Sequence, residues 1–199
     1  MAVALKANAL ITLLELDEFL QITIGDADLS NTLINTASDF IDRFCNRSFI
    51  KATYTNEEYD GDGNNNIYLR KFPIVSVASV VLYDTYTAAI LQTFVVNTEY
   101  LIYLNEGYIY MRSKTSRGHK NYRVTYDAGY LLADIPYDLK NACAQLAGLV
   151  YYNKGKAGVK SESIGKYSIT YDKGDLSISG IAVPDDIACV ILQYRNINM

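Results

Sequence analysis

Several residue types that carry chemistry are scarce in this sequence. It has no tryptophan, one histidine, His119, and three widely spaced cysteines, Cys45, Cys143 and Cys189, which form no CxxC pair. One histidine and dispersed cysteines do not make a zinc site, so the sequence predicts neither a metal site nor a cofactor. All three cysteines lie in apolar helical patterns, which predicts buried free thiols in a reducing compartment.

Positive charge and long apolar runs are also lacking. Lys and Arg number 18 against 22 Asp and Glu, which gives a net charge of −4. An acidic chain is poorly suited to hold the phosphate backbone tightly, although DNA could pass close by. The apolar N-terminus is interrupted by Lys6, Asn8 and Glu15. It is therefore a poor signal peptide and too short to span a bilayer.

Tyrosine, in contrast, is abundant, with 18 residues in a chain of 199. Tyrosine favours strands and half-exposed surfaces, because one end of its ring is apolar and the other polar. Its abundance predicts β structure and contact surfaces. The length allows one domain, or one domain with a sizeable insert.

Helical patterns occupy both ends of the chain. Thr12 and Glu15 form a capping box that predicts a helix up to about residue 20. An apolar stripe predicts a second helix over residues 28–45. Helical patterns return near 135–150 and 183–195, each with a proline in its first turn. The third helix carries small residues that would let another helix approach closely: Ala142, Ala144, Ala147 and Gly148.

Between these helices, from about residue 49 to 130, the pattern is β. The candidate strands are 53–59, 66–71, 75–83, 91–96, 100–104, 108–112 and 122–126. Short strands at close intervals predict a small antiparallel sheet or barrel.

Residues 161–171, SESIGKYSITY, form a further candidate strand. Tyr167, Ile169 and Tyr171 alternate with polar residues, which is the period of a half-buried strand. A single strand needs a partner for its backbone hydrogen-bonding groups. The partner is either a local hairpin, for example with residues 176–178, or another subunit.

The acidic loop 60–64, DGDGN, places oxygen ligands at alternate positions, as a calcium loop does. Asn65 and Lys71 stand where that loop requires glycine and glutamate, so a hairpin turn is favoured. The basic run 112–123 could touch phosphate, but charges split between strand faces or merely solubilising are the favoured interpretation.

Five acidic residues are expected on the outer faces of the first two helices, as Glu15, Asp17, Glu18, Asp39 and Asp42. Solvated helix faces explain them. The alternative is that they line a channel and keep polyanionic DNA from adhering.

Seven segments, taken in order, carry a resemblance to a known family. They are ALITL (9–13), ASDFIDRFCNRSF (37–49), YDGDG (59–63), LRKFPI (69–74), VTYDAGY (124–130), IPYDLK (135–140) and SESIGKYSITY (161–171). Together they resemble the head-to-tail connector proteins of tailed bacteriophages, also called adaptor or head-completion proteins. The resemblance covers most of the chain, and residues 84–121 match least.

The resemblance implies a small helical bundle, often with a β insertion between its second and third helices. The expected fold class is α+β: a small four-helix bundle with a Tyr-rich antiparallel β insertion there and a short β-hairpin between helices 3 and 4. The expected domains are a helical connector core, residues 1–49 and 131–199, and a β insertion, residues 50–130.

The family also implies a function. Its members form rings, commonly dodecameric, beneath the portal protein at the DNA exit vertex, and the resemblance brings no catalytic residues. We therefore predict a structural adaptor in the virion neck, made in the host bacterial cytoplasm, and not an enzyme or a membrane protein. Its predicted partners are the portal, the next neck or tail protein, and DNA that passes without sequence-specific binding. The alternatives are a stopper or tail-completion protein, an enzyme, or a β-type ligand-binding module.

Subunit or portal contacts are predicted at two places, the strand 161–171 and the exposed side of the last helix with the tail 196–199. The residues assigned to these contacts are Ser161, Ile164, Tyr167, Ile169, Tyr171, Tyr194 and Arg195.

Overall fold

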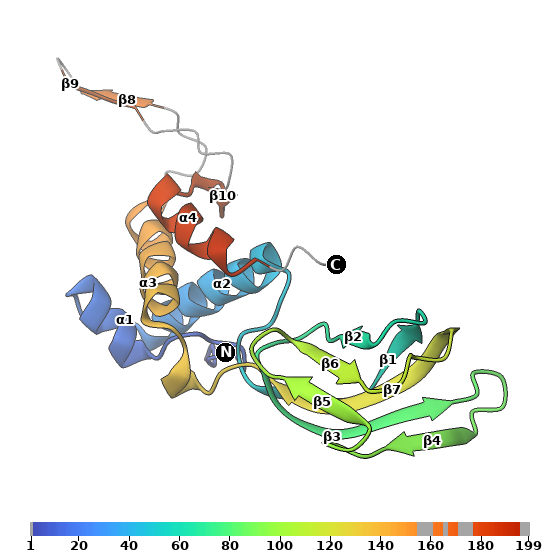
Figure 1. Cartoon of the computed structure of the whole chain (residues 1–199). Helices are drawn as coiled ribbons and strands as arrows, with labels where there is room; N and C mark the ends of the chain where they lie inside the picture. Colours follow the sequence, from blue (N-terminus) through green and yellow to red (C-terminus); the bar gives the residue numbers. More distant parts are fainter. Residues whose placement is uncertain (1, 155–160, 165–166, 171–176, 196–199) are drawn as a thin grey trace. The chain divides into compact units, whose positions relative to one another are not determined.

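The computed structural model describes residues 2–154, 161–164, 167–170 and 177–195 (Figure 1). The chain divides into two compact units. A helical unit comprises Met1–Arg47 and Leu132–Met199, and a β unit comprises Ser48–Leu131.

The helical unit contains α1 (Leu13–Leu20), α2 (Ala27–Cys45), α3 (Tyr137–Tyr152) and α4 (Asp185–Gln193), with a short 3-10 helix, η1 (Leu132–Asp134). The predicted capping box is confirmed at the start of α1. The Glu15 backbone N–H donates to Thr12 Oγ1 at 3.2 Å, and the Thr12 N–H donates to Glu15 Oε2 at 2.7 Å. Asp26 caps α2, which ends at Asn46 in a left-handed conformation with φ of 52°.

Helix α3 is the centre of this unit and packs against α1, α2 and α4 (Figure 1). Its small residues make this possible, as predicted. A Cβ atom added at Gly148 would lie 2.7 Å from Leu20 Cδ2 on α1. On another side of α3, Cys143 Sγ lies 3.6 Å from Ser38 Oγ on α2. These contacts bury 8 of the 16 residues of α3.

The overall class is α+β, but the prediction of a four-helix bundle is wrong. Helices α1 and α4 have 8 and 9 residues, whereas α2 and α3 have 19 and 16. A bundle requires helices that run side by side along a common core. Here the two short helices cover parts of α3, and strands make up about as much of the chain as helices do.

The segment between α3 and α4 also differs from the prediction of one hairpin. Strand β8 (Ser161–Ile164) pairs with β9 (Tyr167–Thr170), and β10 (Ser177–Ile178) pairs with β11 (Ile181–Ala182). The candidate strand 161–171 therefore folds back on itself, and residues 177–178 pair with 181–182 instead. Tyr171 lies outside the described residues.

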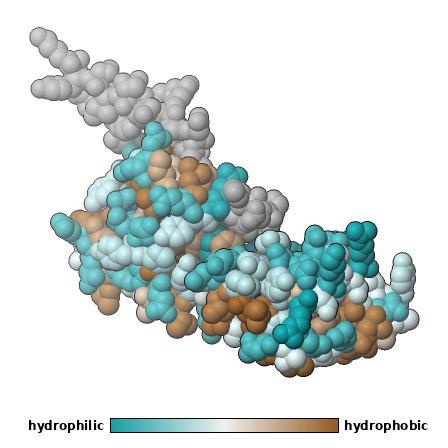
Figure 2. Space-filling model, in the orientation of Figure 1, coloured by the Kyte–Doolittle hydropathy of each residue, from teal (hydrophilic) through white to brown (hydrophobic). Residues whose placement is uncertain are grey.

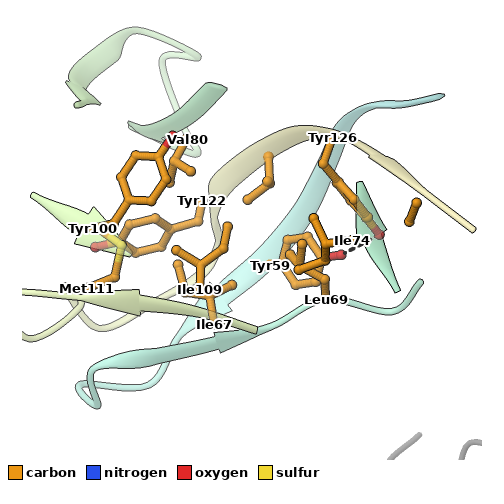
Figure 3. Packing of buried hydrophobic residues seen from close by; sticks show 12 residues of the cluster. Tyr59, Ile67, Leu69, Ile74, Val80, Tyr100, Ile109, Met111, Tyr122 and Tyr126 are labelled. Atoms are coloured by element: carbon orange, nitrogen blue, oxygen red, sulfur yellow. Dashed lines mark hydrogen bonds between the residues drawn. The ribbon is translucent and has the colours of Figure 1, made fainter. Parts of the chain in front are cut away.

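The β unit contains two antiparallel sheets. The first has the strand order β1 (Ala52–Gly61), β7 (Gly118–Ala128), β3 (Ile74–Tyr83) and β4 (Ile90–Phe94). The second has the order β2 (Asn66–Tyr68), β6 (Tyr108–Met111) and β5 (Tyr100–Tyr103). Inward side chains from both sheets form one apolar cluster, shown in Figure 3.

Buried tyrosines in this cluster require partners for their hydroxyl groups, and Glu57 supplies one. The Tyr59 and Tyr126 hydroxyls lie 3.2 Å apart and both donate to Glu57 Oε2 (Figure 3 shows the two tyrosines). Arg70 Nη1 lies 3.3 Å from the other Glu57 oxygen. Burial, with the hydrogen bonds to Glu57, raises the pKa of both tyrosines well above its usual value. Both hydroxyls therefore remain neutral donors.

A β-bulge in β1 places Glu57 in this position. The register with β7 shifts between Tyr54 and Glu57, and Asn56 has a positive φ of 52°. Tyr54 packs against the core before the bulge, and Tyr59 is buried after it. Two inward residues separated by an odd number of positions are impossible in a regular strand, so the bulge resets the alternation.

We predict that Gly148→Val destabilises the helical unit by about 1–3 kcal/mol, because the added methyl groups meet Leu20 in a packed core. Helix propensity alone would favour valine over glycine. Urea unfolding measures the difference, and Gln145→Val at an exposed position of the same helix is the matched control. Equal stability of Gly148→Val and wild type would contradict the packing of α3 against α1.

Candidate interaction surfaces

Among the described residues, no cluster of His, Cys, Asp or Glu side chains could hold a metal ion. The helices of the described part are each too short or too polar to cross a membrane.

The acidic loop 60–64 uses its oxygens within the protein. Asp62 Oδ1 accepts from the Asn64 backbone N–H at 2.8 Å and from Thr115 Oγ1 at 3.3 Å. Asp60 Oδ1 accepts from the Lys120 N–H at 2.6 Å. The hydrogen bond from Lys120, with the nearby His119, lowers the pKa of Asp60. These contacts support the turn interpretation over a calcium loop.

The acidic residues of α1 and α2 are not all solvated, so the prediction for them is wrong in part. Asn8 Nδ2 donates to Asp39 and Asp42 at 2.9 and 3.0 Å, and Lys6 pairs with Asp39. Glu15 Oε1 lies 2.7 Å from Nζ of Lys140, whose side chain is 11 % exposed. These carboxylates stabilise the helical unit, which weakens the proposal that they line a channel. Glu18, by contrast, is exposed.

The N-terminal segment lies along α2 through these and further polar contacts. The Lys6 N–H donates to Asn35 Oδ1 at 2.9 Å, and Asn35 Nδ2 donates to the Ala4 carbonyl at 3.0 Å. Asn31 Nδ2 donates to the Val3 carbonyl at 2.7 Å. Polar side chains on one face of α2 are therefore already used within the chain.

Two of the five basic residues in the run 112–123 contact the same carboxylate. Lys120 and Arg123 lie 3.6 and 3.5 Å from Glu58 oxygens, and Arg123 stacks on the Tyr83 ring at 3.7 Å. His119 Nδ1 lies 3.0 Å from Asp60 Oδ1. Arg112, Lys114 and Arg117 of the run are exposed.

The predicted contact residues at the end of the chain touch their own unit. The Tyr194 hydroxyl donates to the Asp138 carboxylate at 2.7 and 2.9 Å. The Arg195 guanidinium lies 5.6 Å from the Phe44 ring centroid. Exposed residues nearby, missed in the sequence, are Cys189 and Leu192, which is 48 % exposed.

The cysteines differ in environment, so the prediction of three buried thiols is wrong for Cys189. Cys45 and Cys143 are buried, and burial raises the pKa of each to about 12. Cys189 is exposed, because Ile187 and Ile191 define the buried side of α4 and residue 189 lies opposite. This periodicity was visible in the sequence.

The register of the β8–β9 hairpin sorts its residues onto two faces. Ile164 is paired with Tyr167, and Glu162 with Ile169, so these positions share one face. The other face carries four hydroxyl residues, Ser161, Ser163, Ser168 and Thr170. The hairpin thus brings together three of the predicted contact residues, Ile164, Tyr167 and Ile169.

The β unit exposes apolar side chains on both sheets, and Figure 2 shows them gathered over β4 and β5. On the second sheet, Tyr108 lies between Tyr103 and Tyr68, with ring centroids 4.5 and 5.5 Å away. On the first, Ile90 and Leu91 of β4 are 70 % and 63 % exposed. Exposed apolar strands of this kind are characteristic of proteins that assemble with other chains.

The model of the head completion protein family, HCP, matches residues 9–197, so this chain belongs to that family. This confirms the family resemblance and makes the protein a structural component of a phage neck. No curated protein matches the chain.

Solved structures with a similar fold include two from gene transfer agent (GTA) particles. One, the neck of an empty GTA particle computed with C6 symmetry, is 14 % identical with a TM-score of 0.56, over 100 % of this chain and 94 % of that chain. The other, the neck of a native GTA particle computed with C12 symmetry, is 15 % identical with a TM-score of 0.55, over 98 % and 93 %. At this identity, the likeness shows the fold alone.

We predict that one of the three thiols reacts rapidly with a thiol reagent in the native protein. Cys45 and Cys143 are buried with raised pKa values, whereas Cys189 is exposed. Cys189→Ser should abolish the rapid phase, and unfolding in denaturant should release two more reactive thiols. A rapid phase that persists in Cys189→Ser would contradict the burial of the other two.

We also predict that Glu15→Gln lowers stability at neutral pH by about 1–3 kcal/mol, since it removes the negative charge that balances the largely buried Lys140 ammonium. Burial of Glu15 opposes ionisation, but the Lys140 and Thr12 hydrogen bonds prevail and hold its pKa below 4.5. The stabilisation is therefore present above pH 4.5 and is lost as pH falls through the lowered pKa.

Urea unfolding between pH 7 and 3 measures the difference in unfolding free energy between wild type and Glu15→Gln. Lys140→Met and the double variant complete a mutant cycle. If the difference in unfolding free energy between wild type and Glu15→Gln does not decrease at low pH, the Glu15–Lys140 ion pair is contradicted.

Proposed function

We propose that this protein is an adaptor subunit that assembles as a ring beneath the portal, extends the DNA channel and presents a docking surface for the next neck or tail protein. The family match over residues 9–197 carries this proposal. We further propose that the protein acts without catalysis and that the ring is a dodecamer. The C6 and C12 symmetries used for the similar GTA necks are consistent with such a ring.

Ring closure follows from head-to-tail contacts between two different surfaces of each subunit. Each contact can be weak, because many contacts act together in the closed ring. The acidic net charge of −4 suits a channel through which DNA passes without being held.

We assign the β8–β9 hairpin a subunit or portal contact through the face that carries Ile164, Tyr167 and Ile169, and we retain Ser161 and Tyr171 as proposed contact residues. A two-stranded hairpin is marginally stable alone in water, so a partner that covers one face would stabilise it. Tyr194 and Arg195 remain a second proposed contact. Because both already contact their own unit, the exposed Leu192 beside them is the better anchor.

We predict that Ile169→Asp abolishes ring formation on purified portal, since it places a second charge opposite Glu162 on the face that Ile164, Tyr167 and Ile169 share. Ser163→Asp is the control, because Ser163 lies on the hydroxyl face and on β8, the strand that does not carry Ile169. Native mass measurement with and without portal gives the stoichiometry. Rings of Ile169→Asp equal to wild type would refute the assignment of this face, and a wild type that never associates would refute the adaptor.

A further inference from the structure

The β unit contains a long exposed stretch without charge. Residues 85–98, TYTAAILQTFVVNT, include no charged side chain, and all of them except Phe94 are exposed. Strand β4 lies within this stretch, and Val95 and Val96 follow it with 57 % and 41 % exposure. Surface segments of soluble proteins are normally interrupted by charge, so this stretch is unusual.

Strand β4 is an edge strand that is held firmly on its inner side. In the described part of the chain it pairs with β3 alone. Phe94 points into the core and stacks on Tyr122 at 6.0 Å. Glu99 accepts from Gln92 Nε2 at 2.9 Å and from the Val95 N–H at 2.7 Å. The open edge of β4 is therefore preorganised, which lowers the entropic cost of adding a strand.

The connection before β4 is closed by its own hydrogen bonds. The Asp84 N–H donates to the Ala89 carbonyl at 2.8 Å, and the Tyr86 N–H donates to Asp84 Oδ1 at 2.9 Å. A register irregularity lies at Leu91, near the start of the strand, and Gln92–Phe94 then pair regularly with Val80–Leu82. The three residues Gln92–Phe94 thus offer a regular edge.

Strands β1 and β2 have features that protect an edge against edge-to-edge pairing. Strand β1 has a bulge and carries Glu57, Glu58 and Asp60. Strand β2 is three residues long. At the end of β5, the Leu104 carbonyl accepts from the Ile74 N–H at 2.8 Å. Strands β4 and β5 both lack charge and proline, but only β4 lies within the uncharged exposed stretch 85–98, which indicates an edge that is covered when the protein is assembled.

Strand β9, Tyr167–Thr170, has the composition of the missing neighbour. It is uncharged and holds an aromatic and two β-branched residues, whereas β8 contains Glu162. In the described residues one edge of β9 pairs with β8, and no strand pairs with the other. A two-stranded ribbon gains stability when it joins a larger sheet.

We propose that β9 of a second copy of this chain adds to the open edge of β4, so that the sheet β1-β7-β3-β4 continues into the β9–β8 ribbon of the neighbour. Main-chain hydrogen bonds supply the strength of such a contact, and alternate side chains supply its specificity. Each copy uses β4 once and β9 once, which is the head-to-tail contact that closes a ring. The inference rests on the ring proposed above and names its contact.

Hydrogen exchange of the wild type, free and bound to purified portal, tests the inference. Backbone amides of β4 and β9 should exchange more slowly in the ring. Leu91→Lys should fold normally, because Leu91 is exposed, and should raise the concentration needed for ring formation about tenfold or more. Leu101→Lys, at another exposed leucine of the unit, is the matched control and should assemble like wild type.

The identity of the added strand is tested by disulfide formation between two batches in a Cys189→Ser background. Both batches keep the buried Cys45 and Cys143. One batch carries one added cysteine in place of Ile90, Leu91 or Thr93, and the other carries one in place of Ser168 or Thr170. Disulfides between chains of the two batches support the proposal. If the β4 amides exchange more slowly in the ring but no such disulfide forms, β9 is not the partner of β4.

The two proposals fail in different ways. Rings that form while β4 amides still exchange as in the free protein, or that form equally well with Leu91→Lys, overturn strand addition and leave the adaptor proposal standing. A wild type that never associates with portal overturns both.

Discussion

The helical unit depends on the close packing of α3 against three other helices. The β unit interrupts the sequence between α2 and α3, so the contacts of α3 unite helices from both sides of the interruption. Glycine and alanine at the contact positions allow this approach. A Cβ atom added at Gly148 would lie only 2.7 Å from Leu20 Cδ2. The Glu15–Lys140 ion pair joins α1 to the same helix. Helix α3 therefore determines where the outer helices lie, including the exposed side of α4.

The structure of the β unit depends on hydrogen-bond partners for the backbone N–H and C=O groups of its strands. Its bulge in β1 turns Glu57 toward two buried tyrosines, and carboxylates protect that edge. The opposite edge, β4, has no such protection, and the β8–β9 ribbon of the helical unit has one unpaired edge in the described structure. A monomer that leaves these edges open is suited to assembly, since copies can complete each other's sheets.

Local signals in the sequence predicted local structure well. The Thr12–Glu15 capping box and the small residues of α3 were visible because each depends on short spacing. The bulge at Asn56 was not, because an extra residue reverses the alternation on which strand prediction depends. The contacts of Asp39 with Lys6 and Asn8 join distant positions, so sequence pattern alone assigned Asp39 to solvent. The bundle was implied by the family resemblance, and the short lengths of α1 and α4 do not fit it.

The central claim is that this protein occupies the neck beneath the portal as a ring. Electron microscopy of DNA-filled heads that carry the portal, with and without the purified protein, tests it most directly. An added ring of density is expected against the portal at the DNA exit vertex. Density elsewhere on the particle, or heads unchanged by saturating protein, would contradict it.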